Sequence, residues 1–164
     1  MKHTIGQTQN GVFVYVDLIG SQAAKHIAQQ PYLLALAKEM VGKTKVQGTK
    51  ASIEHDMGRP IGYNAVIQTT EKDIVLYGRR LREDIYTRFV KNGKPATTQY
   101  LSATLQRDSD NNYELCDLWI GQLNPPRPGS ENETTDSKPY WANHAFLLDN
   151  QPVQLQTVTK ICPY

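Results

Sequence analysis

The sequence contains little of what a disulfide-bonded or zinc-binding protein needs. It has two cysteines in 164 residues, Cys116 and Cys162, which are too few for a disulfide framework or a zinc cage. Its four histidines lie far apart, and only His55 has acidic neighbours along the chain. We therefore expect no bound metal and no cofactor, and we interpret the two thiols as buried apolar groups.

Long apolar runs and the fingerprints of several common enzyme classes are also absent. No run approaches the roughly 20 apolar residues that span a bilayer, and residues 1–6 lack the apolar core of a signal peptide. The chain has no phosphate-binding loop, no dinucleotide-binding glycine motif and no nucleophile elbow. These absences argue against ATPases, Rossmann enzymes and α/β-hydrolases, and they predict a cytoplasmic protein that has no membrane partner.

A large excess of charge of one sign is missing as well. The 18 Lys and Arg residues exceed the 16 Asp and Glu residues by a formal net charge of only +2. Such a balance permits a nucleic-acid partner only if the basic residues gather in local patches. The hydrophobic content of 39% excludes a disordered chain. At this length the chain is most simply one globular domain over residues 1–164.

The stretch from Thr97 to Gly121 gives the clearest structural signal. Two apolar runs, 100–105 and 113–120, flank a loop of Asp, Ser and Asn residues. These residue types tolerate tight turns, so the two runs are predicted to pair as neighbouring strands. The second run is apolar on both faces, which predicts a strand in the middle of a sheet.

The two faces of this predicted hairpin differ in chemistry. Regular alternation places Leu118 and Ile120 on one face of the second run, and Leu115 and Trp119 on the other. The first run has an apolar face and a hydroxyl-rich face, which consist of Leu101, Ala103 and Leu105, and of Thr98, Tyr100, Ser102 and Thr104. We expect the apolar face to form the core with Leu33, Leu36 and Met40, and the hydroxyl-rich, aromatic face to be the working surface.

The remaining segments predict an α+β fold. Ser21 suits a helix N-cap, Pro31 suits the first position of a second helix, and Gly42 suits its end. The expected strands lie at 12–16, 51–54, 63–69, 73–77 and 153–159, and the expected helices at 21–30, 31–42 and 140–148, the last capped by Ser137. Helix and strand compete in 78–91, where we favour an irregular strand or a short helix. The predicted fold is an antiparallel sheet of five or more strands with an N-terminal helical layer and one late helix. Residues 122–138 are rich in Pro, Ser and Glu and predict a long mobile loop.

The candidate functional residues lie between His55 and Trp119. His55 stands beside a rigid glycine–proline turn, and its ordinary pKa of about 6.5 suits a general acid or base. Arg59 in the same turn suits a phosphate or carboxylate, because its guanidinium forms bidentate hydrogen bonds. Further candidates are the basic residues Arg79, Arg80, Arg88 and Lys91, the hydroxyl groups of Thr98 and Tyr100, and the indole of Trp119. The structural alternatives are a turn-stabilising histidine, a solvated basic face, an exposed strand face and a core aromatic ring.

Residues 54–62 (EHDMGRPIG), 88–101, 119–121 and 140–145 (YWANHA) together resemble an uncharacterised group of bacterial proteins. The order of helices and then strands over 21–121 also resembles the barnase, EndoU and colicin-type ribonuclease toxins. This second resemblance implies metal-free RNA cleavage, in which His55 moves a proton, Arg59 or Arg88 holds the phosphate, and Thr98 or Tyr100 orients it. The chain departs from that family late in the sheet, where Asp117 and Trp119 stand in place of a Thr or Ser.

The leading prediction is therefore a small metal-independent ribonuclease or a related RNA-acting protein, in which Arg79, Arg80, Lys91 and Trp119 bind the substrate. The alternative is a non-catalytic binding module that holds a protein partner or a ligand with a sheet face and the basic cluster. An enzyme would bring His55, a basic residue and a hydroxyl group together around one cleft. A binding module would present a face without convergent titratable groups.

Overall fold

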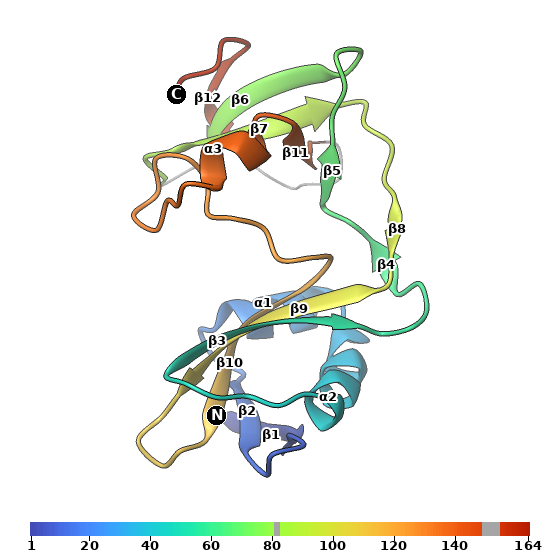
Figure 1. The fold of residues 1–164 in the computed structure, drawn as a ribbon, viewed down its shortest axis with the longest axis vertical. Helices are drawn as coiled ribbons and strands as arrows, with labels where there is room; N and C mark the ends of the chain where they lie inside the picture. The colour runs from blue at the N-terminus through green and yellow to red at the C-terminus, as the bar shows by residue number, and fades with distance from the viewer. Residues whose placement is uncertain (81–82, 149–154) are drawn as a thin grey trace. The chain divides into compact units, whose positions relative to one another are not determined.

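The computed structural model describes residues 1–80, 83–148 and 155–164 and shows an α+β protein with far more strand than helix. The chain forms two compact units (Figure 1). Unit 1 comprises Met1–Gly62 and Thr98–Leu123, and unit 2 comprises Tyr63–Thr97 and Asn124–Tyr164. The sequence predicted a single domain, and the joint unfolding of the two units as one domain stays a prediction.

Unit 1 contains a five-stranded sheet with the order β1-β2-β10-β9-β3. Its strands are β1 (Lys2–Gln7), β2 (Phe13–Asp17), β3 (Lys50–Asp56), β9 (Tyr100–Arg107) and β10 (Tyr113–Ile120). The central position of β10 confirms the prediction from its two apolar faces. The sheet is mixed, because β2 and β10 run parallel, so the prediction of a purely antiparallel sheet is wrong. The polar strand β1 was not predicted, because it lacks an apolar alternation.

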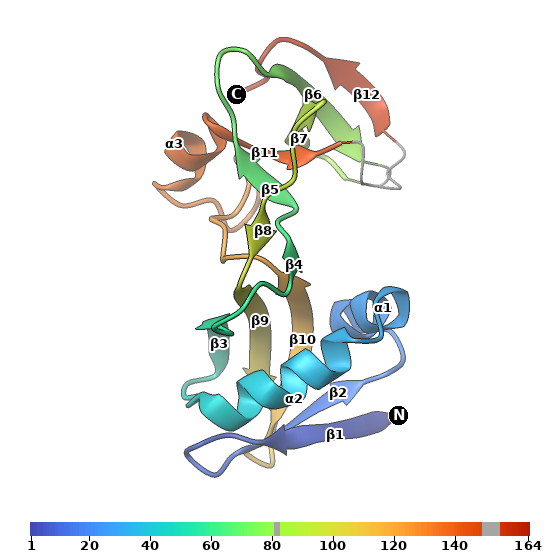
Figure 2. The same ribbon diagram turned by 90° about the vertical axis from the view of Figure 1, so that its right-hand side faces the viewer.

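Two helices, α1 (Gln22–Gln29) and α2 (Leu33–Lys43), belong to unit 1 (Figure 2). The predicted cap is confirmed, since the Ser21 hydroxyl accepts a hydrogen bond from the backbone N–H of Ala24 at 3.0 Å. The helix α2 continues one residue beyond Gly42, where we expected its end. The predicted core is confirmed, because the buried side chains form one cluster that includes Leu33, Leu36, Met40, Leu101, Ala103, Leu105 and Leu118.

An irregularity in β10 explains why this strand looks apolar on both faces. Leu115 pairs with Leu105 on β9, whereas Asp117 pairs with the next residue, Thr104. Cys116 is therefore the extra residue of a β-bulge, which reverses the alternation of the side chains that follow. Leu115 and Leu118 are both completely buried in the same core. The expectation that they lie on opposite faces is wrong for this reason.

Unit 2 contains a second five-stranded sheet with the order β12-β6-β7-β11-β5. Its strands are β5 (Val66–Gln68), β6 (Ile74–Arg80), β7 (Tyr86–Lys91), β11 (His144–Leu147) and β12 (Leu155–Thr159). This sheet is also mixed, because β7 and β11 run parallel. The first residues of the predicted last strand, 153–154, lie outside the described part of the chain. Two further short strands, β4 (Gly62–Tyr63) and β8 (Thr97–Thr98), pair where the chain passes from one unit to the other.

The late helix, α3 (Ser137–Trp141), is shorter than predicted. The segment that follows forms strand β11, in which Ala145 and Leu147 are buried and His144 and Phe146 less so. This is a strand period, and our prediction of a helix over 140–148 is wrong for these residues. Trp141 is buried as a core residue and stacks on Phe146 with 5.2 Å between the ring centroids. No described helix has both the length and the apolar character needed to cross a bilayer.

The predicted mobile loop, residues 122–138, has several anchors within unit 2. Arg127 lies 2.7 Å from Glu83 and also contacts the Thr87 hydroxyl group. The indole N–H of Trp141 donates a hydrogen bond to the Pro125 carbonyl oxygen at 3.0 Å. These contacts hold the part of the loop that lies between Asn124 and α3. The mobility of the segment stays a prediction.

Candidate functional site

The predicted functional residues are divided between the two units. Unit 1 holds the predicted acid or base, one arginine and the hydroxyl groups, namely His55, Arg59, Thr98 and Tyr100, together with Trp119. Unit 2 holds the remaining basic residues, namely Arg79, Arg80, Arg88 and Lys91. The geometry of each group is therefore described within its own unit.

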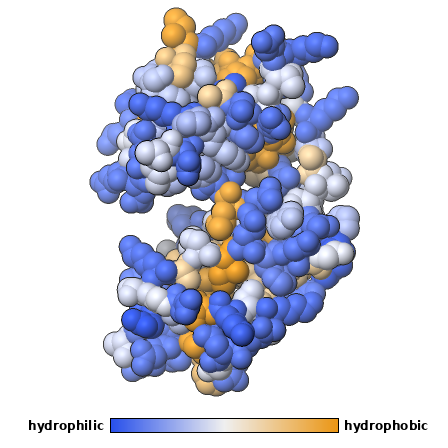
Figure 3. All heavy atoms as spheres, viewed as in Figure 1, coloured by the Kyte–Doolittle hydropathy of each residue, from blue (hydrophilic) through white to orange (hydrophobic). Residues whose placement is uncertain are grey.

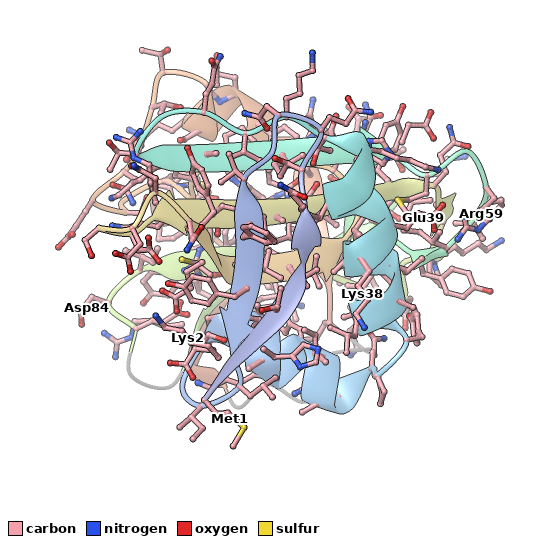
Figure 4. The ribbon with its side chains drawn as sticks, turned by 90° about the horizontal axis from the view of Figure 1, so that it is seen from below. Met1, Lys2, Lys38, Glu39, Arg59 and Asp84 are labelled. Carbon is pink, nitrogen blue, oxygen red and sulfur yellow. The ribbon has the colours of Figure 1, made fainter. Side chains whose placement is uncertain are left out.

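Arg59 is already engaged by a carboxylate of unit 1. Its two Nη atoms donate to the two carboxylate oxygens of Glu39 on α2, at 2.9 and 2.8 Å (Figure 4). The hydrogen bonds from Arg59, followed by that from Lys43, lower the pKa of Glu39 to about 2. The bidentate arrangement that would hold a phosphate is thus occupied by an internal partner.

His55 and the Tyr100 hydroxyl lie on opposite faces of the unit 1 sheet. In the β3–β9 ladder His55 pairs with Leu101, whereas the next residue, Asp56, pairs with Tyr100. Paired residues share a face and successive residues alternate, so His55 lies on the face of the buried Leu101. Thr98 is buried and its hydroxyl accepts the Tyr100 backbone N–H at 3.2 Å. Unit 1 therefore does not bring the imidazole of His55 and the hydroxyl of Tyr100 together at one site, and the catalytic roles of these residues stay predictions.

The hydroxyl-rich face of unit 1 carries carboxylates beside its hydroxyl groups. Asp56 pairs with Tyr100 and Glu54 pairs with Ser102 on β9. On the other side of β9, Glu114 pairs with Gln106. Because paired residues share a face, these acidic side chains lie next to the row that we predicted as a working surface. Negative charge repels phosphate, so this face is poorly suited to RNA.

The chain that follows β10 covers part of this hydroxyl-rich face. The Ser102 hydroxyl is completely buried and donates to the Gly121 carbonyl oxygen at 2.7 Å. The backbone N–H of Leu123 donates to a carboxylate oxygen of Glu54 at 2.8 Å. The indole N–H of Trp119 donates to the Gln122 carbonyl oxygen at 3.2 Å. These hydrogen bonds give Ser102 and Trp119 structural partners.

A histidine–aspartate pair in unit 1 escaped the sequence analysis. The Nδ1–H of His26 on α1 donates to the Leu118 carbonyl oxygen at 2.7 Å and lies 3.2 Å from an Asp117 carboxylate oxygen. The hydrogen bond to Asp117 is the main cause of the raised pKa of His26. Asp117 already stood out as a charge in an apolar strand, but His26 and Leu118 are 92 positions apart. The pair fastens α1 to the bulged part of β10.

Unit 2 brings two arginines and two tyrosines onto one sheet face. In the β6–β7 ladder Tyr77 pairs with Arg88, and Arg79 pairs with Tyr86. Residues two apart on a strand share a face with their cross-strand partners, so the four side chains form one block. The arginines occupy one diagonal of this block and the tyrosines the other. We call Tyr77, Arg79, Tyr86 and Arg88 the basic–aromatic face.

Arg88 is a buried arginine, and its hydrogen-bond acceptors in the described part of the chain are all neutral. It is 9% exposed, and it donates to the Tyr77 hydroxyl, the Thr69 hydroxyl and the His144 carbonyl oxygen at 3.3, 2.8 and 3.1 Å. Among the described residues, no carboxylate forms an ion pair with it. Buried arginines are normally paired, because taking an uncompensated charge out of water costs several kcal/mol. An anion at this position would supply the missing charge.

The other basic residues of unit 2 differ in their placement. The Nε atom of Arg79 is buried, and it has no hydrogen-bond partner in the part of the chain that the structure describes. Lys91 is exposed at the end of β7 and, by alternation from Arg88, lies on the opposite face. The side chain of Arg80 lies outside the described part. Unit 2 has ten Lys and Arg residues against eight Asp and Glu, whereas unit 1 has eight of each, so the net positive charge belongs to unit 2.

Burial raises the pKa of the Tyr77 phenol above its ordinary value, while the hydrogen bond from Arg88 lowers it. Tyr77 therefore keeps its proton at neutral pH. Its ring also meets that of Tyr164 edge to face, with 5.9 Å between the ring centroids. The basic–aromatic face thus presents the neutral Tyr77 phenol beside Arg88.

Within the described ranges, no group of three or more His, Cys, Asp or Glu side chains could hold a metal ion. Comparison with known proteins finds no family that matches the chain, no similar curated protein and no similar solved structure.

Proposed function

We propose that the protein acts on RNA and binds it through the basic–aromatic face of unit 2. The observation that carries this proposal is the charge of Arg88, which is buried and has no carboxylate partner among the described residues. The Nε of Arg79, which has no hydrogen-bond partner within the described ranges, adds a second donor on the same face. A phosphate group would compensate the buried charge of Arg88 with its negative charge and would offer an acceptor oxygen to Arg79.

Two tyrosines on this face favour RNA over a small inorganic anion. Single-stranded nucleic acids are bound by cations that follow the phosphates and by aromatic rings on which bases stack. Tyr77 and Tyr86 are partly exposed, and their diagonal crosses the one between Arg79 and Arg88. In this proposal Arg79 makes the direct phosphate contact, Arg88 supplies buried positive charge, and the phenol rings contact bases. An RNA partner also fits the cytoplasmic location predicted from the sequence.

RNA cleavage by His55 is a separate step, and the geometry of unit 1 gives it less support. Arg59 is held by Glu39, and the sheet separates His55 from the Tyr100 hydroxyl. The direct assay incubates the protein with RNA in the presence of chelator. Cleavage by the wild type that is lost in His55→Ala would support the ribonuclease prediction, because removing a general acid or base lowers the rate about 10²–10⁴-fold. Equal cleavage by both proteins would remove His55 from the mechanism.

The non-catalytic binding module remains the second candidate function. The carboxylates that line the hydroxyl-rich face of unit 1 favour it, since that face repels nucleic acid but suits a basic partner surface. We further propose that α1 and α2 form the helical layer predicted from the sequence, packed on the sheet of unit 1. The shared core cluster of helix and strand residues supports this layer.

The test of RNA binding compares two arginine variants that lose the same charge. Arg79→Ala removes an arginine whose Nε has no partner among the residues that the structure describes, whereas Arg59→Ala removes one that is neutralised by Glu39. The binding of fluorescent single-stranded RNA would be measured by fluorescence anisotropy over a series of salt concentrations. Arg79→Ala should weaken binding for all sequences and reduce the salt slope by about 1, while Arg59→Ala should leave both unchanged. An absence of RNA binding by the wild type, or equal losses in the two variants, would contradict the proposal.

A further inference from the structure

Strand β3 is an edge of the unit 1 sheet, and no other described strand pairs with its outer backbone groups. The hydrogen-bond pattern tells which groups point outward. The N–H of Met57, just after β3, donates to the carbonyl oxygen of Gln99, just before β9, and the N–H of Arg107 at the end of β9 donates to that of Thr49. Odd-numbered residues of β3 therefore bond to β9, and even-numbered residues direct their N–H and C=O groups away from the sheet. The outward residues are Lys50, Ser52, Glu54 and Asp56.

The sequence of β3 is self-complementary about its central residue. In an antiparallel pair of two β3 strands centred on Ile53, Lys50 of each copy lies opposite Asp56 of the other. Ser52 then lies opposite Glu54, and Ile53 lies opposite itself. Opposite charges that face each other across strands are stabilising, whereas like charges are destabilising. Charged side chains on an edge strand usually prevent its pairing with another chain, but in this one register they attract each other.

We propose that β3 pairs with β3 of a second copy of this chain, which would join two five-stranded sheets into one continuous sheet. All four outward residues of each copy would be in hydrogen-bonded pairs, which gives up to about eight backbone hydrogen bonds. Ile53, which is partly exposed, would gain an apolar neighbour across the axis. Figure 3 shows apolar side chains exposed among polar ones on unit 1.

The other edges do not offer the same match. Strand β1 carries one charged residue, Lys2, and its ladder with β2 has an irregularity between Thr4 and Gly6. Strand β5 has only three residues, and β12 has a register shift next to Leu155. A single pair of strands is expected to bury less than the roughly 1,200 Å² of standard interfaces, so the dimer should form and dissociate with protein concentration.

The register can be tested by a disulfide across the axis. In a non-hydrogen-bonded pair the two Cα atoms are about 4.5 Å apart, which is within disulfide range. In a background with Cys116→Ser and Cys162→Ser, Ile53→Cys should form a covalent dimer under mild oxidation. Ala51→Cys is the matched control, because it lies opposite His55 in this register. Its two thiols would be about 13 Å apart along the strands and should remain unlinked.

Sedimentation velocity over a range of concentrations tests the association itself. The wild type should dimerise, and Ser52→Pro should be monomeric, because proline removes an outward N–H without touching the bonds to β9. Lys50→Glu should weaken the dimer, and adding Asp56→Lys to it should restore dimerisation. Melting temperatures measured in parallel show that each variant is folded. A wild type that stays monomeric at all concentrations, an undisturbed dimer in Ser52→Pro, or equal cross-linking of the two cysteine variants would overturn the proposal.

Discussion

Replacing Leu115 or Leu118 by alanine tests the bulge that shapes the core of unit 1. Both side chains are completely buried in the core cluster of unit 1. Each substitution removes three carbon atoms, for which the lost transfer free energy is about 2.4 kcal/mol at about 0.8 kcal/mol per group. The cavity that remains adds to this, so we expect each variant to lose about 3–5 kcal/mol of unfolding free energy.

The assay is urea unfolding followed by far-ultraviolet circular dichroism and by tryptophan fluorescence, with the slope m fitted separately for each variant. Leu123→Ala is the control, because Leu123 is 36% exposed and follows the same strand; we expect it to lose less than about 1 kcal/mol. In a regular strand, Leu115 and Leu118 would lie on opposite faces. A loss below about 1 kcal/mol for either one would therefore refute the bulge at Cys116.

Three further predictions concern pH and local anchoring. The pKa of His26 is raised, so its pairing with Asp117 stabilises the fold fully below about pH 6.5, and this stabilisation is lost as the pH rises through the folded-state pKa. The difference in unfolding free energy between the wild type and Asp117→Asn should therefore shrink between pH 5 and pH 9, and a constant difference would contradict this prediction. The pKa of Glu39 is about 2, so the stabilisation of the fold by its pairing with Arg59 should be present above pH 4.5 and disappear as the pH falls toward 2. In Arg59→Gln the pKa of Glu39, measured by NMR, should rise toward 4.5, and an unchanged value would exclude the ion pair. Finally, Arg127→Ala, which removes the contacts to Glu83 and Thr87, should speed cleavage at Glu131 and Glu133 by a glutamate-specific protease, whereas an unchanged rate would show that Arg127 is not an anchor.

Local signals in the sequence were sufficient for most elements of unit 1. The Ser21 cap, the apolar spacing from Leu33 to Met40 and the alternation of Leu101, Ala103 and Leu105 each depend on near neighbours in the chain. Pairing between distant strands leaves no such local mark. The parallel contact of β2 with β10 joins segments about 100 residues apart, and nothing in either strand specifies the direction of its partner.

The candidate site shows the same limit in its chemistry. The sequence identified Arg59 and Arg88 as phosphate-binding candidates on equal terms. Only the fold shows that Arg59 is neutralised by Glu39 on α2, whereas Arg88 is buried among neutral acceptors. The bulge at Cys116 likewise has no signature in residue types, because it follows from the register between β9 and β10. Electrostatic pairing between distant segments therefore decided which residues form the candidate site.

The most direct test of RNA binding by unit 2 is ultraviolet cross-linking of the wild-type protein to single-stranded RNA, with the linked peptides identified by mass spectrometry. Aromatic rings that contact bases are well placed to form such links. We expect cross-linked peptides from β6 and β7, at Tyr77 and Tyr86, and we expect excess salt to abolish them. Cross-links confined to the strands of unit 1, or none at RNA concentrations that saturate binding, would contradict the account.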